Sequence, residues 1–558
     1  MTPRTAWRNT ENEIAMQPLA QEINDRVPDD SPGAREIGFS VPTRYNASAI
    51  LFDNLAAGRG GRVAVTGPAG TRTYDELCAD AARFGNTLLS LGLIRGDRIL
   101  LFLDDTPVYP AVLFGAIRAG LVPLLINTLT PPDLLQFLLA DSSARVAVAE
   151  ASFADRFNSV ACSSTELATL AVIGEPPSGT AVKAISLDRL AKTAAPALPA
   201  CDTHRNEMAF WMYSSGSTGR PKGIVHLQHD MIYTVQSYAK HVLALGPDDR
   251  CFSVPKIFFA YGFGNSLAFP FSVGASSVLL PGQPKPDKIF DAIAQHRPSI
   301  FFGLPTLYTA LTKAPEAAAA DLSSLRLCVS AAEILSPDVF EAWKKMSGLE
   351  IVEGLGSTEV LHIYLSNRVD AKKLGAAGKR VPGYELALKD VEGKEVGDGQ
   401  EGILWVRGHS SAPCYWKRAD KTAETMREHG WLYTGDRFVR DADGFHFFRG
   451  RADDLIKVSG QWVYPLEVEL CLAKHPRVRE CAVLAIQLPD RRMTLKAYVV
   501  LEDRSRDNEE TTRVLQDYVK SSLLPYKYPR IVEYVDDLPK TGTGKIDRQA
   551  LAKMAASA

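Results

Sequence analysis

The chain has 558 residues, of which 46% are hydrophobic and 23% are charged. This length exceeds what one hydrophobic core accommodates, so we expect at least two domains, and the composition excludes a chain that is disordered throughout. The net charge of -2 gives no strongly basic surface for nucleic acid or an anionic membrane. We therefore expect no nucleic-acid partner, and any phosphate must be bound by local contacts.

The cysteines and the apolar segments favour a cytoplasmic protein. The eight cysteines are scattered without a C-x-x-C pair, which is typical of reduced thiols rather than of a metal or redox site. The first 25 residues are polar and have no apolar stretch of the length that a signal peptide needs, so we do not expect secretion. Residues 257–280 are long enough to span a membrane, but Asn265, Pro270 and three glycines favour a buried strand, loop and helix instead.

The first half of the chain alternates between strand-like and helix-like segments. After a polar leader at residues 1–35, we expect a strand at residues 98–103, a helix at 108–119 and a strand at 121–126. This order predicts a parallel sheet, and similar alternation continues towards residue 365. Residues 175–200 are rich in Pro, Ala and Gly and are expected to form a surface loop or short edge elements.

The pattern changes after about residue 375. Short segments broken by Gly-Asp and Asp-Gly pairs predict hairpins in a small β subdomain at residues 375–451. We therefore predict a large domain at residues 36–451 and a smaller C-terminal domain at 452–558. The expected class is α/β, with doubly wound sheets and the β subdomain in the large domain, followed by a mobile α+β domain.

A glycine-rich segment, YSSGSTGRPKG, occupies residues 213–223 and follows the apolar run MAFWM. Its glycines let backbone N–H groups turn inward, while Thr218 adds a hydroxyl group and Lys222 a point charge, a combination that binds phosphate. It is not a Walker loop, because Pro221 stands where the second glycine belongs and Gly223 follows the lysine. Taken alone, the segment also fits a flexible surface turn, although Arg-Pro-Lys-Gly disfavours that interpretation.

A second glycine-rich segment, YVDDLPKTGTGKIDR, lies near the carboxyl end at residues 534–548. It presents Lys540 and Lys545 around TGTG, and Ile546 follows Lys545 where a Walker loop has Ser or Thr. In isolation this segment would be interpreted as a mobile basic loop. Its significance comes from the other motifs of the chain.

Three further motifs lie between these loops: GLGSTE at residues 354–359, YTGD at 433–436 and GRADDLIKVSG at 450–460. In this order the five motifs resemble those of the adenylate-forming superfamily, which includes acyl-CoA ligases, luciferases and peptide-synthetase adenylation domains. The resemblance covers nearly everything from about residue 40 to residue 553. Agreement among five ordered motifs argues against coincidence. It implies activation of a carboxylic acid by ATP as an acyl-adenylate.

The resemblance implies particular roles in nucleotide binding. The β- and γ-phosphates would be held by the first loop, mainly through Thr218 and Lys222, while Thr358 would contact the α-phosphate. Glu359 would bind Mg²⁺, an ion that keeps most of its waters and needs few protein oxygens. The implied ATP contacts are Ser214, Ser215, Gly216, Ser217, Thr218, Gly219, Lys222, Ala332, Glu333, Gly354, Leu355, Gly356, Thr358, Asp436 and Arg451.

Within this set, Asp436 would accept hydrogen bonds from the ribose hydroxyls, and Arg451 would reach the ribose or a phosphate. The segments around Ala332 and Leu355 would enclose the adenine. Many relatives have an aromatic residue where this chain has Leu355, so apolar contact is expected in place of a ring stack.

The catalytic residues implied by the resemblance are Lys545, Thr218 and Glu359. Lys545 would stabilise the negative charge that develops between the carboxylate and the α-phosphate. Asp453 matches the hinge about which the small domain rotates after adenylation. Gly460 matches the glycine that leaves room for the pantetheine arm of coenzyme A.

The segment VPKIFFAYGFG at residues 254–264 occupies the place where relatives bind the acyl group. Together with GSTEVLHIYLSN and KVSGQWVYPLEVE, it most closely resembles the benzoate-CoA ligases. Aromatic and small side chains there predict a flat slot for a ring. The predicted pocket residues are Phe259, Ala260, Tyr261, Gly262, His362 and Ile363.

The expected activity is thus ligation of benzoate or a substituted benzoate to coenzyme A, with release of AMP and pyrophosphate. The pocket leaves benzoate, 2-aminobenzoate, 4-hydroxybenzoate and chain acids open, because one small ring substituent changes binding by only about 1–3 kcal/mol. A catalytically idle nucleotide-binding regulator of the same fold is the alternative from another class. The expected partners are the acid, ATP and coenzyme A, without a membrane, and a homodimer is compatible with the resemblance.

Overall fold

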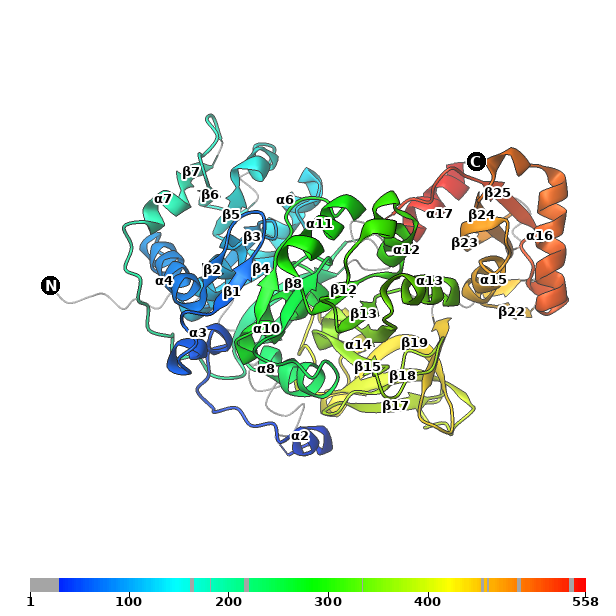
Figure 1. Cartoon of the computed structure of the whole chain (residues 1–558), viewed down its shortest axis with the longest axis horizontal. Helices are drawn as coiled ribbons and strands as arrows, with labels where there is room; N and C mark the ends of the chain where they lie inside the picture. Colours follow the sequence, from blue (N-terminus) through cyan, green and yellow to red (C-terminus); the bar gives the residue numbers. More distant parts are fainter. Residues whose placement is uncertain are drawn as a thin grey trace. The chain divides into compact units, whose positions relative to one another are not determined.

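The structure, a computed structural model, describes residues 30–160, 165–180, 182–214, 220–333, 335–452, 456–458, 461–488, 493–540 and 546–557. It is a mixed α/β protein, as predicted, and it divides into two compact units (Figure 1). The larger unit comprises residues 1–386 and 405–433, and the smaller one comprises 387–404 and 434–558. The domain boundary that we expect after residue 451 stays a prediction.

The larger unit contains a nine-stranded sheet that is parallel through its centre (Figure 1). Only its outer pairs, β1 with β2, β14 with β15 and β15 with β16, are antiparallel. In spatial order the strands are β16 (Lys379–Arg380), β15 (Ile363–Ser366), β14 (Ile351–Gly356), β13 (Leu327–Ala331), β12 (Ile300–Gly303), β10 (Arg250–Ser253), β11 (Ser276–Val278), β1 (Val63–Thr66) and β2 (Arg72–Thr73).

A seven-stranded sheet lies in the same unit and is also parallel, except for its last pair, β8 with β9. The predicted strand, helix and strand near residues 98–126 are confirmed as β3, α5 and β4. In spatial order the strands are β7 (Lys183–Ser186), β6 (Thr169–Ile173), β5 (Val146–Glu150), β3 (Arg98–Phe102), β4 (Val122–Leu125), β8 (Met208–Ser214) and β9 (Lys222–Leu227).

The predicted hairpins after residue 375 form a four-stranded sheet through which the division between the units passes. Its strands, in order, are β17 (Glu385–Lys389), β18 (Glu401–Arg407), β19 (Leu432–Arg440) and β20 (His446–Arg451). The smaller unit also has the hairpin β21 (Ile456–Val458) and β22 (Gln461–Val463), and a sheet of β23 (Val478–Gln487), β24 (Met493–Leu501) and β25 (Ile531–Tyr534).

Helices begin where the sequence offers caps. The side chain of Thr73 and that of Glu76 form a reciprocal capping box at the first turn of α4. The α-helices are α2 (Pro32–Ile37), α3 (Ala49–Ala56), α4 (Tyr74–Ser90), α5 (Val108–Arg118), α6 (Pro132–Ser142), α7 (Leu187–Ala191), α8 (Asp230–Thr234), α9 (Ala260–Phe263), α10 (Phe269–Val273), α11 (Pro286–His296), α12 (Pro305–Lys313), α13 (Pro337–Ser347), α14 (Ala419–Thr425), α15 (Pro465–Leu472), α16 (Glu509–Ser522) and α17 (Arg548–Ser557).

Shorter helical turns connect these elements. The 3-10 helices are η1 (Ala151–Phe157), η5 (Pro315–Ala319), η6 (Thr358–Val360), η7 (Glu428–Gly430), η8 (Arg504–Arg506) and η9 (Pro525–Lys527), and the π-helical turns are η3 (Val235–Ala239) and η4 (Gly264–Ala268). Such π-helical turns often occur at functional sites. One of them, η4, directly follows the segment that we expect to bind the acyl group.

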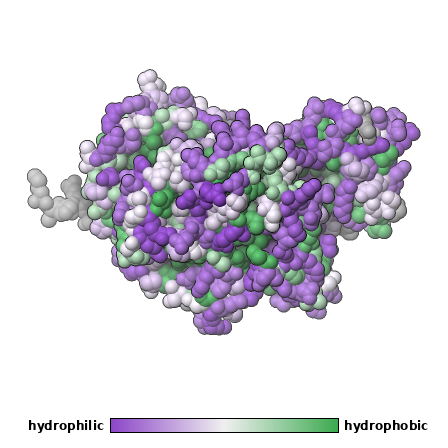
Figure 2. Space-filling model, in the orientation of Figure 1, coloured by the Kyte–Doolittle hydropathy of each residue, from purple (hydrophilic) through white to green (hydrophobic). Residues whose placement is uncertain are grey.

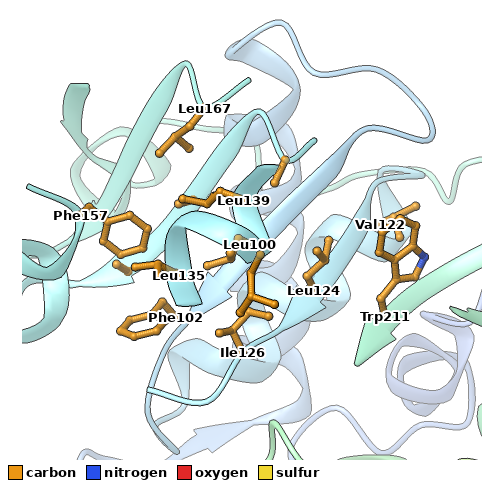
Figure 3. Packing of buried hydrophobic residues seen from close by; sticks show 14 of the residues in the cluster. Leu100, Phe102, Val122, Leu124, Ile126, Leu135, Leu139, Phe157, Leu167 and Trp211 are labelled. Atoms are coloured by element: carbon orange, nitrogen blue, oxygen red, sulfur yellow. The ribbon is translucent and has the colours of Figure 1, made fainter. Parts of the chain in front are cut away.

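The apolar residues of the seven-stranded sheet form one of the hydrophobic cores (Figure 3). Leu100 and Phe102 on β3 face Leu135 and Leu139 on α6, and Trp211 extends the cluster onto β8. All five residues of β3 are buried, which is the pattern of a parallel strand covered on both faces. A second core cluster lies on the nine-stranded sheet, and two more lie in the smaller unit.

The apolar run at residues 257–280 folds into α9, η4, α10 and β11, in agreement with the prediction of a buried segment. Within the described residues, no helix combines the length and the apolar character that crossing a membrane requires. Figure 2 shows a face on which hydrophilic residues predominate and hydrophobic ones are interspersed. The seven described cysteines are free thiols, and all except Cys201 are buried.

We predict that Leu100→Ala destabilises the larger unit. Leu100 is fully buried in the core, so its truncation leaves a cavity that should cost about 2–5 kcal/mol. Leu190→Ala is the control, because Leu190 is exposed. Thermal unfolding followed by circular dichroism should give a lower melting temperature for the first variant only, and equal temperatures for the two would contradict the assignment of this core.

Candidate active site

The first glycine-rich loop connects two paired strands of the seven-stranded sheet. Ser214 ends β8 and lies opposite Lys222, the first residue of β9. Of the seven residues between them, five lie outside the described residues, namely Ser215, Gly216, Ser217, Thr218 and Gly219. Because β8 runs parallel to β4, the loop leaves the carboxyl end of the parallel strands, where α/β sheets usually bind ligands.

The GSTE segment leaves the nine-stranded sheet in the same way. Strand β14 ends at Gly356, and Thr358 and Glu359 lie in the following turn, η6. The hydroxyl group of Tyr415 donates a hydrogen bond of 2.8 Å to Oε1 of Glu359. Nζ of Lys222 lies 4.0 Å from the centre of the Tyr415 ring, within the range of a cation–π contact. Tyr415 thus brings the lysine of one motif and the glutamate of another to a single side chain.

A buried histidine joins the same two motifs. Nε2 of His226, on β9, lies 3.0 Å from the backbone oxygen of Thr358, and Nδ1 lies 2.9 Å from Oδ2 of Asp230. The two ring nitrogens thus reach a backbone oxygen on one side and a carboxylate oxygen on the other. The side chains of His226 and Asp230 are fully buried. The contact therefore fixes the turn that carries Glu359 relative to the strand that carries Lys222.

The segments expected at the adenine lie on adjacent parallel strands, β13 and β14, in which Ala331 is opposite Gly354. Ala332 follows β13 with a φ of 75°, a left-handed conformation that is unusual for alanine. Oε2 of Glu333 accepts a hydrogen bond from the backbone N–H of Thr306. Leu355 is partly exposed near the end of β14, so its apolar side chain is available on that edge of the sheet.

The two parts of the predicted acyl pocket are in contact. Phe259 precedes α9, which contains Ala260, Tyr261 and Gly262, and Nε2 of His362 lies 3.3 Å from the backbone oxygen of Tyr261. Ile363 begins β15 directly after His362 and is buried. A side chain at Gly264 would collide with the His362 ring, because its Cβ would lie 2.4 Å from Cδ2. The structure therefore brings all six predicted pocket residues into two adjoining segments.

His362 lies within a group of aromatic rings. The centre of its ring is 4.5 Å from that of Phe269, 5.1 Å from that of Tyr238 and 5.7 Å from that of Tyr261. Burial lowers the pKa of His362 to about 3, because the charged form loses its hydration. His362 is therefore a neutral ring in this part of the molecule, not a cation for a carboxylate.

In the smaller unit, Asp436 and Arg451 lie opposite each other on β19 and β20. Nη1 of Arg451 is 3.2 Å from Oδ1 of Asp436 and donates a second hydrogen bond to the backbone oxygen of Thr434. The hydroxyl group of Thr434 accepts a hydrogen bond from the backbone N–H of Asp436. The YTGD and GRADD motifs thus form one ordered ion pair at the end of a hairpin.

Three predicted residues, Asp453, Gly460 and Lys545, lie outside the described residues. The chain on both sides of the segment that contains Lys545 is attached to the smaller unit. Before it, Lys540 forms an ion pair with Glu480 on β23. After it, Nη2 of Arg548 is 2.7 Å from Oε2 of Glu469 on α15. The predicted catalytic, hinge and coenzyme A roles stay predictions.

Sequence reasoning missed Tyr415, His226 and Asp230. Tyr415 lies in the run PCYWK, which carries no motif, and its partners are 56 and 193 positions away in the chain. His226 and Asp230 directly follow the first loop in IVHLQHD, and their spacing of four residues was the available signal. Within the described residues, no group of three or more His, Cys, Asp or Glu side chains gathers as a metal site.

Comparison with known proteins places this site in a family. Residues 52–416 match the AMP-binding enzyme family, and residues 467–545 match the AMP-binding enzyme C-terminal domain. The chain belongs to the AMP-binding enzyme family. This match, together with the relatives described next, confirms the expected resemblance to the adenylate-forming superfamily.

Individual relatives are similar over almost the whole chain. A benzoate–CoA ligase of Thauera aromatica is 42% identical over 513 residues, which cover 91% of this chain and 96% of that protein. A 4-hydroxybenzoate–CoA/benzoate–CoA ligase of Rhodopseudomonas palustris is 40% identical and covers 92% of this chain and 95% of that protein. The crystal structure of an anthranilate CoA ligase in complex with anthranoyl-AMP aligns with a TM-score of 0.86 and 38% identity, covering 93% and 99% of the two chains.

A benzoate CoA ligase from Burkholderia xenovorans has a TM-score of 0.82 and 39% identity, and the alignment covers 91% of this chain and 99% of that one. These similarities extend to both units of the chain. They agree with the predicted fold class.

We predict that His362 stays neutral between pH 5 and pH 8 in the folded protein. Its pKa is lowered to about 3, whereas an unfolded histidine binds a proton near pH 6.5, so this residue makes the fold less stable as the pH falls below about 6.5. NMR of protein labelled at the histidine rings, with His362→Gln used for assignment, should give a signal that does not titrate in this range. A His362 signal with a midpoint near pH 6.5 would refute the burial described here.

Proposed function

We propose that the chain is an AMP-forming acid–thiol ligase that joins benzoate or a substituted benzoate to coenzyme A through an acyl-adenylate. The observation that carries the proposal is the 42% identity to a benzoate–CoA ligase over 91% of this chain. The anthranilate and hydroxybenzoate ligases among the relatives support the same class of acid.

The arrangement of the site suits the activation of a carboxylate. A carboxylate oxygen attacks the α-phosphorus of ATP, pyrophosphate leaves, and the acyl group becomes bonded to AMP. This step needs positioning and neutralisation of charge rather than covalent help from the protein. Lys222 and Glu359 meet at Tyr415, and His362 and Ile363 follow Glu359 by only three and four residues. The phosphate contacts and the ring pocket therefore share one short segment of chain.

In this proposal, Mg²⁺ enters with ATP as part of the substrate. Glu359 offers one carboxylate, which suits an ion whose other ligands are phosphate oxygens and water. Because Tyr415 donates to Oε1, the carboxylate is held in one orientation before the nucleotide binds. Thr218 and Lys222 would contact the β- and γ-phosphates, and Thr358 the α-phosphate. Asp436 and Arg451 would bind the ribose.

The second half-reaction transfers the acyl group to sulfur. The thiol of coenzyme A loses its proton and attacks the acyl carbon, and AMP leaves with the oxygen that came from the acid. We assign Gly460 to the passage of the pantetheine arm and Asp453 to the hinge. Since ATP and coenzyme A are abundant in the cytoplasm, we propose that the enzyme works there, and a homodimer stays a prediction.

The ring pocket favours aromatic acids over chain acids. Phe259 and Tyr261 supply aromatic surface next to Ala260 and Gly262, and the neutral ring of His362 lies against Tyr261. A flat apolar slot of this kind gains most from a planar ring. Benzoate, 2-aminobenzoate and 4-hydroxybenzoate are the acids to distinguish, and an idle nucleotide-binding regulator is the second candidate.

We predict acid-dependent release of pyrophosphate from ATP and Mg²⁺ with benzoate-type acids, and thioester formation when coenzyme A is added. Lys545→Ala should abolish adenylation, because it removes the charge expected at the transition state, while thioester formation from preformed benzoyl-AMP should change little. Lys520→Ala is the control, since Lys520 is an exposed lysine of the same unit. If no acid caused release of pyrophosphate, the hypothesis of an idle nucleotide-binding regulator would replace that of a ligase. If hexanoate were preferred, the ligase hypothesis would stand and only the predicted aromatic pocket would be rejected.

We also predict that Tyr415→Phe weakens the use of MgATP. A hydrogen bond to a charged group is worth about 1.5–3 kcal/mol, so the KM for MgATP should rise by roughly tenfold or more. Tyr308→Phe is the matched control, because the Tyr308 hydroxyl group donates to the backbone oxygen of Val329 inside the core. An unchanged KM in Tyr415→Phe would show that this hydroxyl group does not orient Glu359 for the nucleotide.

A further inference from the structure

A largely buried pair of charged side chains lies at the turn that precedes residues 259–262 of the predicted ring pocket. Nζ of Lys256 is 2.8 Å from Oδ1 of Asp104 and 2.7 Å from the backbone oxygen of Leu280. The Lys256 and Asp104 side chains are only 15% and 12% exposed. Oδ2 of Asp104 accepts a hydrogen bond from the backbone N–H of Gly282. Among the described residues, the side chains of Lys256 and Asp104 form hydrogen bonds to Leu280, Gly282, Asp105 and each other, and the backbone N–H of Asp104 donates one to Glu150.

The ion pair joins the two large sheets. Asp104 lies just beyond β3 of the seven-stranded sheet, whereas Lys256 and Gly282 lie beyond β10 and β11 of the nine-stranded sheet. Each contact therefore connects loops at the carboxyl ends of parallel strands, the usual place for ligands in such sheets. All of these residues belong to the larger unit.

Asp105 adds a second acid next to the ion pair. Its Oδ1 accepts a hydrogen bond from the backbone N–H of Ile257. Burial raises the pKa of Asp105 to about 7, with Asp104 and Glu150 adding to the rise and Lys256 opposing it. Tyr109 on α5 also faces this carboxyl group. While Asp105 is protonated, Asp104 and Lys256 balance each other.

The backbone at Lys256 supports the pocket directly. The N–H of Phe259 donates a hydrogen bond of 3.0 Å to the oxygen of Lys256. A side chain at Gly262 would collide with the same turn, because its Cβ would lie 2.1 Å from the oxygen of Lys256 and 2.3 Å from that of Pro255. The start of α9 therefore rests on the turn that Lys256 and Asp104 hold in place.

We propose that the ion pair between Lys256 and Asp104, together with Asp105, positions residues 259–262 and thereby determines which ring the pocket accepts. This inference rests on the proposed function, and it assigns a positioning role to residues that do not touch the acid. A displacement of about 1 Å at a reacting group can change a rate by about a hundredfold. Because the ion pair fixes the position of residues 259–262, it should affect which acid is placed correctly for reaction. Breaking the pair leaves one buried charge without its partner.

The test compares Lys256→Met, Asp104→Asn and the double variant with the wild type, using benzoate, 2-aminobenzoate and 4-hydroxybenzoate. The two single variants should raise the KM for benzoate by roughly tenfold and reduce the discrimination among the three acids. The KM for MgATP should change less than about twofold, since within the described part of the chain the pair contacts neither Lys222 nor Glu359. The effects of the two substitutions should not multiply in the double variant, because each removes the same interaction.

Two further variants separate positioning from general damage. Lys256→Arg keeps the charge and should recover most of the wild-type preference. Lys344→Met is the matched control, because Lys344 forms an ion pair of 2.7 Å with Glu350 at the surface, and the preference should stay unchanged. If Lys256→Met does not fold, the double variant, which removes both charges of the pair, provides the measurement.

The variant Asp105→Asn tests the role of Asp105 separately, through the pH dependence of the KM for benzoate. Ionisation of Asp105 above about pH 7 adds a negative charge beside the carboxyl groups of Asp104 and Glu150, so the KM for benzoate should rise with pH in the wild type. The variant keeps the acceptor for Ile257 but has no charge to gain, so its KM should stay level between pH 6.5 and pH 8.5. Identical pH profiles would contradict the role of Asp105.

The proposal is overturned if Lys256→Met raises the KM for MgATP and for benzoate by the same factor, or lowers only the melting temperature. Failure of the proposed function would look different, because the wild-type enzyme itself would then release no pyrophosphate with any of the three acids.

Discussion

The hydrogen bond from His226 to the backbone oxygen of Thr358 connects the two sheets on which the candidate site is built. Each sheet sends its motif from the carboxyl end of a parallel strand, β8 in one case and β14 in the other. The separation of Lys222 from Glu359 therefore depends on how the sheets are joined. A fully buried ring paired with Asp230 is a rigid connection, because any movement would leave charged or polar groups without partners.

Buried polar contacts join the two sheets at two places in the larger unit. His226 and Tyr415 join the sheets beside the phosphate motifs, and Lys256 with Asp104 joins them beside the ring pocket. Buried polar contacts of this kind add little net stability but restrict the geometry. An enzyme that must bring a carboxylate to the α-phosphorus needs such restriction, since the protein contributes mainly by positioning.

Much of the fold could be predicted because its information is local. The buried run of β3, the helix α5 and the strand β4 follow from hydrophobic periodicity, and the hairpins of β17 to β20 follow from turn residues. The motif residues were found because their glycines, hydroxyl groups and charges are contiguous in the sequence. Contacts such as Tyr415 with Glu359 or Lys256 with Asp104 connect residues 56 and 152 positions apart, and no local pattern encodes them.

The fate of the carboxylate oxygens is the most direct test of whether an acyl-adenylate forms. Benzoate labelled with ¹⁸O in both oxygens would be incubated with ATP, Mg²⁺ and coenzyme A, and the nucleotide and phosphate products analysed by mass spectrometry. Attack on the α-phosphorus predicts one ¹⁸O atom in AMP and none in pyrophosphate. Label in pyrophosphate or inorganic phosphate, or thioester formation with unlabelled AMP, would contradict the account.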